Sequence, residues 1–352
     1  MDSSFDEFYM QRCLQLAKLG AGNVAPNPMV GAVLVHEGRI IGEGYHQQYG
    51  HAHAEVNCVR SVKPEDQPLI PASTMYVSLE PCAHYGKTPP CAELIVAQKI
   101  GEVVIGCVDT FSQVSGRGIA ILKEAGVNVR THVLEAACRQ LNERFFTFHE
   151  QQRPYIILKW AQSAAGYMAA ADGSPVRISN PLTDRLVHRW RSEETGILVG
   201  TNTAVADNPR LNNRYWTGKD PVRIVIDRTL KTPRHYHLWN GAAPTLFITG
   251  EAAGKEGETE MVTADFGQPL LPQLMQLLHE RRILSVLVEG GPYVLNEFIK
   301  AGLWDEARVI IGSHSLPDGV QSPVLSHSLL TDETLLDGDR ILYYRNRKEG
   351  TV

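Results

Sequence analysis

HAHAE at residues 51–55 and PCAHYGKTPPC at residues 81–91 are the two stretches of sequence that decide the fold of the first half of the chain. Together they supply an imidazole and the thiols of Cys82 and Cys91. One imidazole and two thiolates leave the fourth position of a tetrahedral Zn²⁺ open to water, and this open position distinguishes a catalytic from a structural zinc site. The two stretches therefore predict a catalytic zinc site.

Glu55 is the acidic residue of the first stretch and lies two positions after His53. It is close enough to reach a water on the metal without being a ligand. His-x-Glu followed by Pro-Cys and a second Cys is the signature of zinc-dependent deaminases, in which the Glu moves protons. The alternative is a set of unrelated core residues, since an isolated Cys is usually a small buried side chain. The joint occurrence in this order favours the metal site.

The bulk composition describes a globular protein of two domains. A chain of 352 residues with 43% hydrophobic and 21% charged residues is long enough for two cores. Its net charge of −5 disfavours a protein whose main function is to grip a nucleic-acid backbone. We find no signal peptide and no apolar run that could span a bilayer, so the cysteines are expected as reduced thiols in the cytoplasm. We expect those outside the motif in the core: Cys13, Cys58, Cys107 and Cys138.

The apolar periodicity predicts an α/β fold for the first half. We expect helices near 7–19, 53–61, 118–125 and 134–148, a β-hairpin within 30–44, and strands at 74–79, 102–108 and 127–133. This alternation favours a three-layer α/β/α domain with a largely parallel sheet. Pro81 suits the first position of a helix, which would place Cys82 at a helix start, where a thiolate is stabilised.

Three further residues are candidates for substrate contacts. Asn27 lies between two prolines just before the predicted hairpin and could hydrogen-bond a base edge, whereas the alternative is an ordinary turn residue. Lys87 and Thr88 lie between the two cysteines of the motif. A cation and a hydroxyl donor in one loop could hold a phosphate.

Three motifs resemble the bifunctional riboflavin-biosynthesis deaminase/reductase family: PNPMVG at 26–31, HAHAE at 51–55 and LEPCAHYGKTPPC at 79–91. The resemblance implies a cytidine-deaminase-like domain that deaminates 2,5-diamino-6-ribosylamino-4(3H)-pyrimidinone 5′-phosphate. It also implies His53, Cys82 and Cys91 as zinc ligands and Glu55 as the proton shuttle. We predict that the same motifs contact the substrate through Asn27, His51, Lys87 and Thr88.

A polar run before Pro154 predicts the domain boundary, so we expect domains at 1–150 and 151–352. Strands are expected at 155–160, 197–199, 222–226, 246–248 and 286–288, helices near 272–281 and 294–301, and surface loops at 254–260 and 313–332. No GxGxxG follows a strand, which disfavours a Rossmann domain. EGGP at 289–292 opens a helix and could hold a phosphate on its backbone N–H groups, although a plain tight turn is the alternative.

The second half resembles the reductase domain of the same family through KWAQS at 159–163, Arg191, GTNTAVADNPRLNNR at 200–214 and EGGP at 289–292. The resemblance implies a dihydrofolate-reductase-like α/β fold and NADPH-dependent reduction of the ribosyl group to a ribityl chain. By position, the cofactor contacts would be Ala161, Thr203, Asp207, Gly290 and Gly291. The substrate contacts would be Ser163, Arg191, Leu211, Arg214 and Glu289, and the arginines suit a phosphate.

Two departures from the family pattern concern the reductase half. Ala165 stands where the family usually has Asp, and Arg177 stands where it usually has Trp. Loss of this carboxylate would lower the reaction rate by roughly 10²–10⁴-fold if general acid–base catalysis depends on it. The rate would change little if the carboxylate only stabilises a turn.

We therefore expect a cytoplasmic, homo-oligomeric enzyme that uses zinc and NADPH on a phosphoribosylated pyrimidine, without nucleic-acid or membrane partners. One alternative is an active deaminase fused to an impaired reductase. The others are a nucleic-acid deaminase and a zinc-stabilised binding module without activity.

Overall fold

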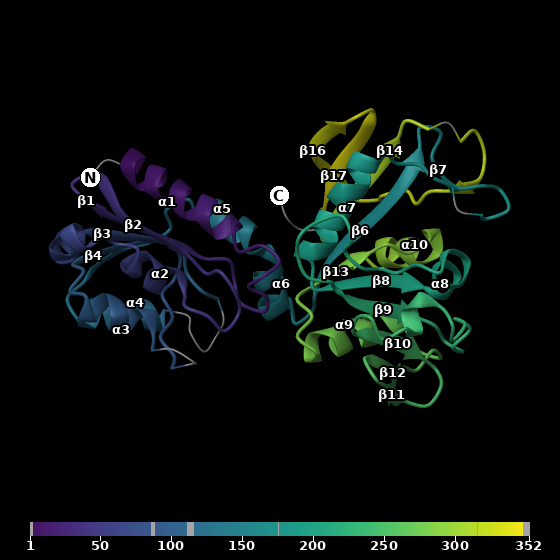
Figure 1. Ribbon diagram of the computed structural model, residues 1–352, viewed down its shortest axis with the longest axis horizontal. Coiled ribbons are helices and arrows are strands. Elements are labelled where there is room, and N and C mark those ends of the chain that lie inside the picture. Colours follow the sequence, from purple (N-terminus) through teal and green to yellow (C-terminus); the bar gives the residue numbers. More distant parts are fainter. Residues whose placement is uncertain (1–2, 86–88, 111–115, 175, 315, 348–352) are drawn as a thin grey trace. The chain divides into compact units, whose positions relative to one another are not determined.

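In the computed structural model of the chain, residues 3–85, 89–110, 116–174, 176–314 and 316–347 are described. The chain divides into two compact units, Met1–Gln152 and Arg153–Val352, where the sequence predicted domains at 1–150 and 151–352 (Figure 1). No helix in the described ranges is long and apolar enough to cross a membrane.

The first unit is built on a five-stranded sheet with the order β2-β1-β3-β4-β5. Its strands are β1 Gly31–His36, β2 Arg39–Tyr45, β3 Thr74–Leu79, β4 Glu102–Cys107 and β5 Asn128–Arg130. β1 pairs antiparallel with β2 and β3, whereas β3, β4 and β5 are parallel. The predicted hairpin is confirmed. The sheet is mixed rather than fully parallel, because β1 runs opposite to both of its neighbours, while the other four strands point the same way, in agreement with the prediction of a largely parallel sheet.

Helices cover both faces of this sheet (Figure 1). The helices packed on one face are α1 Ser3–Lys18, α5 Glu135–Leu141 and α6 Glu143–Gln151. Those on the other face are α2 Ala54–Arg60, α3 Cys91–Ala97, α4 Arg117–Glu124 and the 3₁₀ helix η1 Pro64–Ala72. Successive residues of β1 alternate between the two cores, as the pleat requires. The predicted core cysteines have no exposed surface, which confirms that prediction: Cys13, Cys58, Cys107 and Cys138.

Two local predictions for the first unit are wrong. Pro81 does not begin a helix; the helix of this region begins at Cys91, with Pro90 as its N-cap residue. The helix expected at 134–148 is interrupted at Asn142, whose backbone has φ −108° and ψ 24°. The side-chain amide of Asn142 accepts a hydrogen bond from Met29 N at 2.8 Å and donates one to Met29 O at 2.9 Å. The break therefore lets Asn142 anchor the segment before β1.

The second unit is built on a ten-stranded sheet with the order β11-β12-β10-β9-β8-β13-β6-β14-β17-β16. Its strands are β6 Tyr155–Ser163, β8 Gly196–Gly200, β9 Val222–Ile226, β10 Thr245–Thr249, β11 Gly254–Glu256, β12 Thr259–Thr263, β13 Ser285–Val288, β14 Glu306–Gly312, β16 Ser328–Leu336 and β17 Asp339–Asn346. β7 Tyr167–Ala169 and β15 Val320–Gln321 form a separate pair. From β12 to β14 the strands are parallel.

The loops expected at 254–260 and 313–332 contain parts of four strands, so this prediction is wrong. β16 is largely exposed and carries polar residues between its apolar ones. An exposed edge strand lacks the apolar alternation that identifies a strand in a sequence.

Helices also cover both faces of the second sheet. α9 Leu270–Glu280 and α10 Pro292–Lys300 pack on one face. α7 Pro181–Glu193 and α8 Thr201–Asp207 pack on the other, and a short 3₁₀ helix, η2, spans His237–Trp239.

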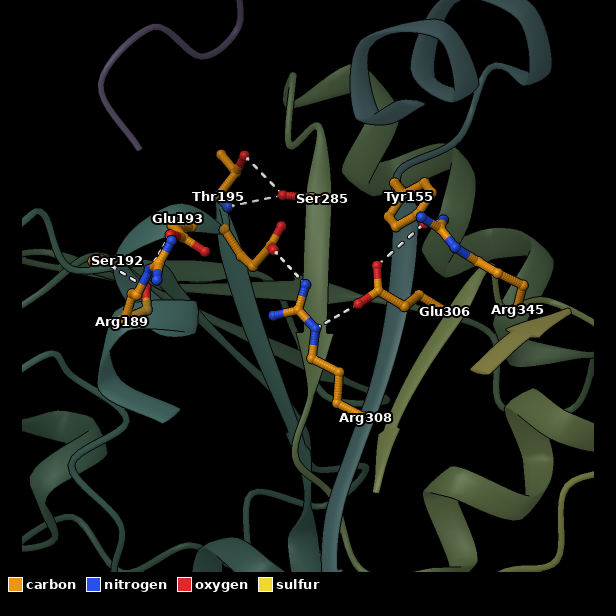
Figure 2. Close-up of polar contacts among 10 residues, drawn as sticks. Tyr155, Arg189, Ser192, Glu193, Thr195, Ser285, Glu306, Arg308 and Arg345 are labelled. Atoms are coloured by element: carbon orange, nitrogen blue, oxygen red, sulfur yellow. Dashed lines mark hydrogen bonds and ion pairs between the residues drawn. The ribbon is translucent and has the colours of Figure 1, made fainter. Parts of the chain in front are cut away.

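A buried ion-pair network ties α7 to the beginning of β14. Arg308 pairs with Glu306 at 2.6 Å and with Glu194, the C-cap residue of α7, at 3.5 Å. Figure 2 shows Arg308 beside Glu306, which also accepts a hydrogen bond from the Tyr155 hydroxyl at 3.3 Å. These three charged side chains are at most 10% exposed. Since an unpaired buried charge is costly, the network fixes the end of α7 against the sheet.

Candidate functional site

The imidazole of His53 and the thiols of Cys82 and Cys91 converge in the first unit. His53 Nδ1 lies 3.5 Å from Cys82 Sγ and 3.4 Å from Cys91 Sγ. All three ligand atoms lie within 4.8 Å of one another. Tetrahedral zinc, with bonds of about 2.0 Å to N and 2.3 Å to S, places such ligand atoms roughly 3.6 Å apart. The donor set and its spacing therefore fit a zinc ion.

Three elements of the first unit position these ligands. His53 is the N-cap residue of α2, Cys82 follows β3, and Cys91 is the first residue of α3. α2 can pack directly on β2 because Gly44 has no side chain, and a Cβ there would collide with the backbone of α2. The N–H of Cys91 donates a hydrogen bond to Cys82 Sγ at 3.3 Å, which joins two of the ligands directly.

Glu80 fixes the segment that leads to Cys82. Its buried carboxylate accepts hydrogen bonds of 3.0–3.3 Å from backbone N–H groups of the segment after β4, those of Asp109, Gly116, Gly118 and Ile119. These bonds hold the approach to Cys82 against that segment.

The two thiols compete for negative charge. Hydrogen bonds with Cys91 and with His53 lower the pKa of Cys82 to about 4, so Cys82 is a thiolate at neutral pH. The hydrogen bond with Cys82, together with burial, raises the pKa of Cys91 far above its usual range. A metal binds cysteine as the thiolate. A divalent cation between the sulfur atoms would therefore stabilise both thiolates at once.

Glu55 lies in the first turn of α2, with 3% of its surface exposed. Burial, and then the charge of Cys82, raise the pKa of Glu55 to about 7. A carboxyl group whose pKa lies near the working pH can both accept and donate a proton. Its position two residues after His53 puts this group beside the ligand cluster.

Asn27 is held next to the cluster by His46, a residue that the sequence did not single out. Asn27 Nδ2 lies 3.2 Å from His46 Nε2, and His46 Nδ1 lies 3.1 Å from Ala52 O. The His46 ring meets the His53 ring edge-on, with centroids 5.3 Å apart. This chain of contacts links the predicted substrate contact to a predicted metal ligand.

Of the remaining predicted contacts of the first unit, only His51 is described, and it is not part of the ligand cluster. His51 is exposed, two residues before His53. Lys87 and Thr88 lie outside the described residues.

The second unit contains a cavity of about 850 Å³ at the carboxyl ends of β6, β8 and β13. This volume is in the range of small-molecule sites, and ligands of parallel sheets bind at this edge. The predicted site residues that line it are Ala161, Thr203, Asp207, Glu289, Gly290 and Gly291. The Gly291 N–H donates a hydrogen bond to Thr203 Oγ1 at 3.0 Å, which joins the turn before α10 to α8.

Glu289 is the centre of an ion-pair triad at this cavity. Its carboxylate lies 2.8 Å from Arg191 Nε, 2.9 Å from Arg191 Nη2 and 3.3 Å from Lys159 Nζ. Burial alone would raise the pKa of Glu289, but the charges of Arg191 and Lys159 outweigh it and hold that pKa well below the usual range. Lys159 and Glu289 line the cavity, so the triad presents a fixed cation to a ligand.

Four predicted substrate contacts of the second unit do not line the cavity: Arg191, which pairs with Glu289, and Ser163, Leu211 and Arg214. Ser163 is fully buried and donates a hydrogen bond to Leu316 O at 3.0 Å. Leu211 packs in the apolar core under α8 and is 3% exposed. Arg214 lies on an exposed loop, and its N–H donates a hydrogen bond to His188 Nδ1 at 2.9 Å.

The two departures from the family pattern have different surroundings. Ala165 is exposed in the turn between β6 and β7 and does not line the cavity. Arg177 does line it and pairs with Asp184 at 2.8 Å, with 62% of its side chain exposed.

Sequence reasoning missed the roles of three residues that the structure brings to the sites. The role of Lys159 could have been predicted, because a charged residue inside the apolar run YIILKWA must be paired with an opposite charge when the strand is buried. No sequence pattern indicated the roles of His46 and His188, since each contacts a residue far away in the sequence.

Comparison with known proteins identifies both halves of the chain. Residues 3–107 match the family described as the cytidine and deoxycytidylate deaminase zinc-binding region, and residues 154–326 match the RibD C-terminal domain. The riboflavin biosynthesis protein RibD of Aquifex aeolicus is 38% identical over 328 residues, covering 91% of this chain and 90% of that protein. RibD of Escherichia coli K12 is 35% identical and covers 87% of each chain.

Two solved structures are similar over nearly the whole chain. A diaminohydroxyphosphoribosylaminopyrimidine deaminase/5-amino-6-(5-phosphoribosylamino)uracil reductase from Thermotoga maritima has a TM-score of 0.89 and 33% identity, covering 98% of this chain and 99% of that one. RibD from Acinetobacter baumannii has a TM-score of 0.87 and 31% identity with the same coverage.

Proposed function

The chain belongs to the RibD family of riboflavin-biosynthesis proteins, and on that premise we propose that its two units catalyse successive steps on one phosphoribosylated pyrimidine. The first unit removes an amino group from 2,5-diamino-6-ribosylamino-4(3H)-pyrimidinone 5′-phosphate by hydrolysis. The second unit then reduces the ribosyl group of the product to a ribityl chain. The cluster of His53, Cys82 and Cys91 carries the first half of this proposal.

In the first reaction, the three ligands would hold Zn²⁺, which lowers the pKa of the attacking water. Glu55 takes the proton from that water and passes it to the departing amino group, which leaves as ammonia. Its pKa of about 7 supports both transfers. Asn27 hydrogen-bonds the pyrimidine edge, with its amide fixed by His46. We also assign binding of the phosphate to Lys87 and Thr88. Only the sequence motif supports this assignment.

In the second reaction, NADPH held by the second unit would supply a hydride to C1 of the ribosyl group. The bond from C1 to the ring oxygen breaks, so that oxygen must gain a proton. Lys159 is suited to donate to it, because Glu289 holds its ammonium group at the cavity. We assign cofactor contacts to the cavity residues Ala161, Thr203, Asp207, Gly290 and Gly291. Arg214 and Arg191 favour binding of the substrate phosphate by their charge.

Two assays on the purified chain test this function. Ammonia release is followed with the diamino substrate, and NADPH oxidation is followed with the isolated deaminated product. Both reactions are expected. Ammonia release without NADPH oxidation would contradict the proposed reductase activity of the second unit. NADPH oxidation without ammonia release would contradict the proposed deaminase activity of the first unit.

The alternative of an impaired reductase rests on Ala165. The exposed position of this residue, away from the cavity lining, favours a minor role in the turn. Ala165→Asp is therefore expected to change the rate of NADPH oxidation by no more than about twofold, as for other surface substitutions. A gain of roughly 10²-fold or more would instead indicate a missing proton donor.

We also propose a cytoplasmic location and a homo-oligomer. All six cysteines of the chain are described and are free thiols, which supports a reducing compartment. The assembly state remains a prediction that light scattering of the purified chain would test.

A further inference from the structure

The loop that carries Arg214 is fastened to α7 by several side chains of that helix. Arg191 Nη1 donates a hydrogen bond to Asn212 O at 3.3 Å, and the Arg189 guanidinium lies 5.7 Å from the Trp216 ring centroid. Trp216 and Arg214 are both exposed. The loop therefore depends on α7 for its course over the surface.

His188 is the residue of α7 that contacts Arg214 itself, through the Arg214 backbone. Its Nδ1 accepts the Arg214 backbone N–H at 2.9 Å, and its ring meets the Tyr215 ring at 4.6 Å and 62°. His188 is 4% exposed, so it is an interior group rather than a surface contact. It fixes both the peptide of Arg214 and the ring of the next residue.

Arg214 is one of three exposed cations of this loop, with Arg210 and Lys219, and it is the one whose backbone α7 holds. Its guanidinium hydrogen-bonds the neutral amide of Asn212, and it takes part in none of the ion pairs found among the described residues. The guanidinium also lies 5.5 Å from the Tyr215 ring centroid. Its direction is therefore set by the backbone and the ring that His188 holds.

We propose that His188 is a positioning residue for Arg214, and that it sets the affinity of the reductase unit for the phosphate of its substrate. This inference rests on the proposed role of Arg214 in binding that phosphate. His188 does not line the cavity. It acts on binding only, through the hydrogen bond to the Arg214 backbone.

The charge state of His188 suits this role. Burial, and then the charges of Arg191 and Arg214, lower its pKa to about 4. His188 is therefore neutral near pH 7, and its Nδ1 keeps the lone pair that accepts the hydrogen bond.

Three substitutions of His188 distinguish the effect of losing its hydrogen-bond acceptor, Nδ1, from the effect of losing the size of its ring. The side-chain oxygen of Asn falls near the position of Nδ1, so His188→Asn keeps the acceptor. His188→Gln places its oxygen one bond further out, and His188→Leu removes the acceptor. Arg185→Ala, on the exposed face of the same helix, is the matched control. Unfolding curves followed by tryptophan fluorescence show whether each variant is folded.

The readouts are the KM for the deaminated product, the kcat of NADPH oxidation, and the Ki of ribose 5-phosphate as a competitor. His188→Gln and His188→Leu should raise KM and Ki by about tenfold, the worth of one well-placed hydrogen bond, with kcat nearly unchanged. His188→Asn and Arg185→Ala should leave all three values near those of the native chain. If His188→Leu does not fold, the Asn and Gln variants decide.

Unchanged KM and Ki in His188→Gln, or an equal rise in His188→Asn, would overturn the inference. Arg214→Ala distinguishes this failure from that of the proposed function. If Arg214→Ala raises KM and the His188 variants do not, only the role of His188 fails. If Arg214→Ala leaves KM unchanged, the assignment of Arg214 to the phosphate fails with it.

Discussion

The two sites of this chain balance charge in opposite ways. In the first unit, a thiolate, a second thiol and the carboxyl group of Glu55 crowd together, and Glu55 takes part in none of the Lys or Arg ion pairs found among the described residues. In the second unit, Glu289 is neutralised by Arg191 and Lys159 before any ligand arrives. The first site thus needs an added cation to balance its charges, whereas in the second site two cations already offset the charge of Glu289.

This difference means that the two sites should fail in different ways. A site that depends on a metal loses activity when the metal or one ligand is removed. A site that depends on a buried ion pair loses stability when one partner is removed, because the other charge stays buried and unpaired.

Cys91→Ser is expected to have the largest effect. The variant should lose zinc and ammonia release completely, because serine is a poor zinc ligand in this position. NADPH oxidation with the deaminated product should remain. Zinc content is measured by metal analysis, with Cys58→Ala as a control that removes a buried thiol outside the cluster. A full zinc complement in Cys91→Ser would contradict the ligand assignment.

Glu55→Gln should keep zinc but lower the rate of ammonia release by roughly 10²–10⁴-fold, the usual worth of general acid–base catalysis. The amide keeps the size of the side chain and cannot move a proton. The exposed Glu7 provides the control Glu7→Gln, which should be silent. Near-native ammonia release in Glu55→Gln would remove this residue from the mechanism.

Glu289→Gln should lower the free energy of unfolding of the second unit by roughly 3–5 kcal/mol, since Arg191 and Lys159 lose a buried counter-charge. All five tryptophans lie in the second unit, so their fluorescence follows its unfolding alone. Glu193→Gln is the matched control, because the Glu193 pair with Arg189 is partly exposed and should be worth only about 0–1 kcal/mol. Equal losses in both variants would argue against the buried triad.

The stability of the second unit should fall as the pH falls from about 6.5 toward 4. The unfolded chain protonates His188 below about 6.5, but the folded chain does so only near 4, since burial and the charges of Arg191 and Arg214 lower its pKa. The unfolded state therefore binds more protons in this window, and lowering the pH favours it. His188→Asn, which does not titrate, should show a flatter curve between pH 7 and 5. The same slope in both proteins would exclude His188 as the cause.

The convergence of the three proposed zinc ligands could be predicted from the sequence because their spacing reflects chemistry that few other arrangements share. His53, Cys82 and Cys91 lie in short motifs whose residue types are those of metal ligands, and they converge as expected. The cavity residues around Gly290 and Gly291 were also brought together. In both cases the functional groups follow the ends of strands, which the apolar pattern locates.

The rest of the sites depends on contacts that local patterns do not encode. Cys82 was expected at a helix start, but Pro90 and Cys91 provide that start instead. Ser163 and Leu211 lie inside the motifs, yet they serve the interior of the second unit. His188 acts on Arg214 across 26 positions of sequence. Such pairings follow from tertiary packing, which a single sequence does not specify.

Removal of zinc from the intact chain tests the contrast between the two sites most directly. The chelator-treated protein is assayed for ammonia release with the diamino substrate and for NADPH oxidation with the deaminated product, before and after Zn²⁺ is restored. We expect ammonia release to disappear and return with the metal, while NADPH oxidation is unaffected throughout. Ammonia release that survives complete removal of zinc, or loss of both reactions together, would contradict the account.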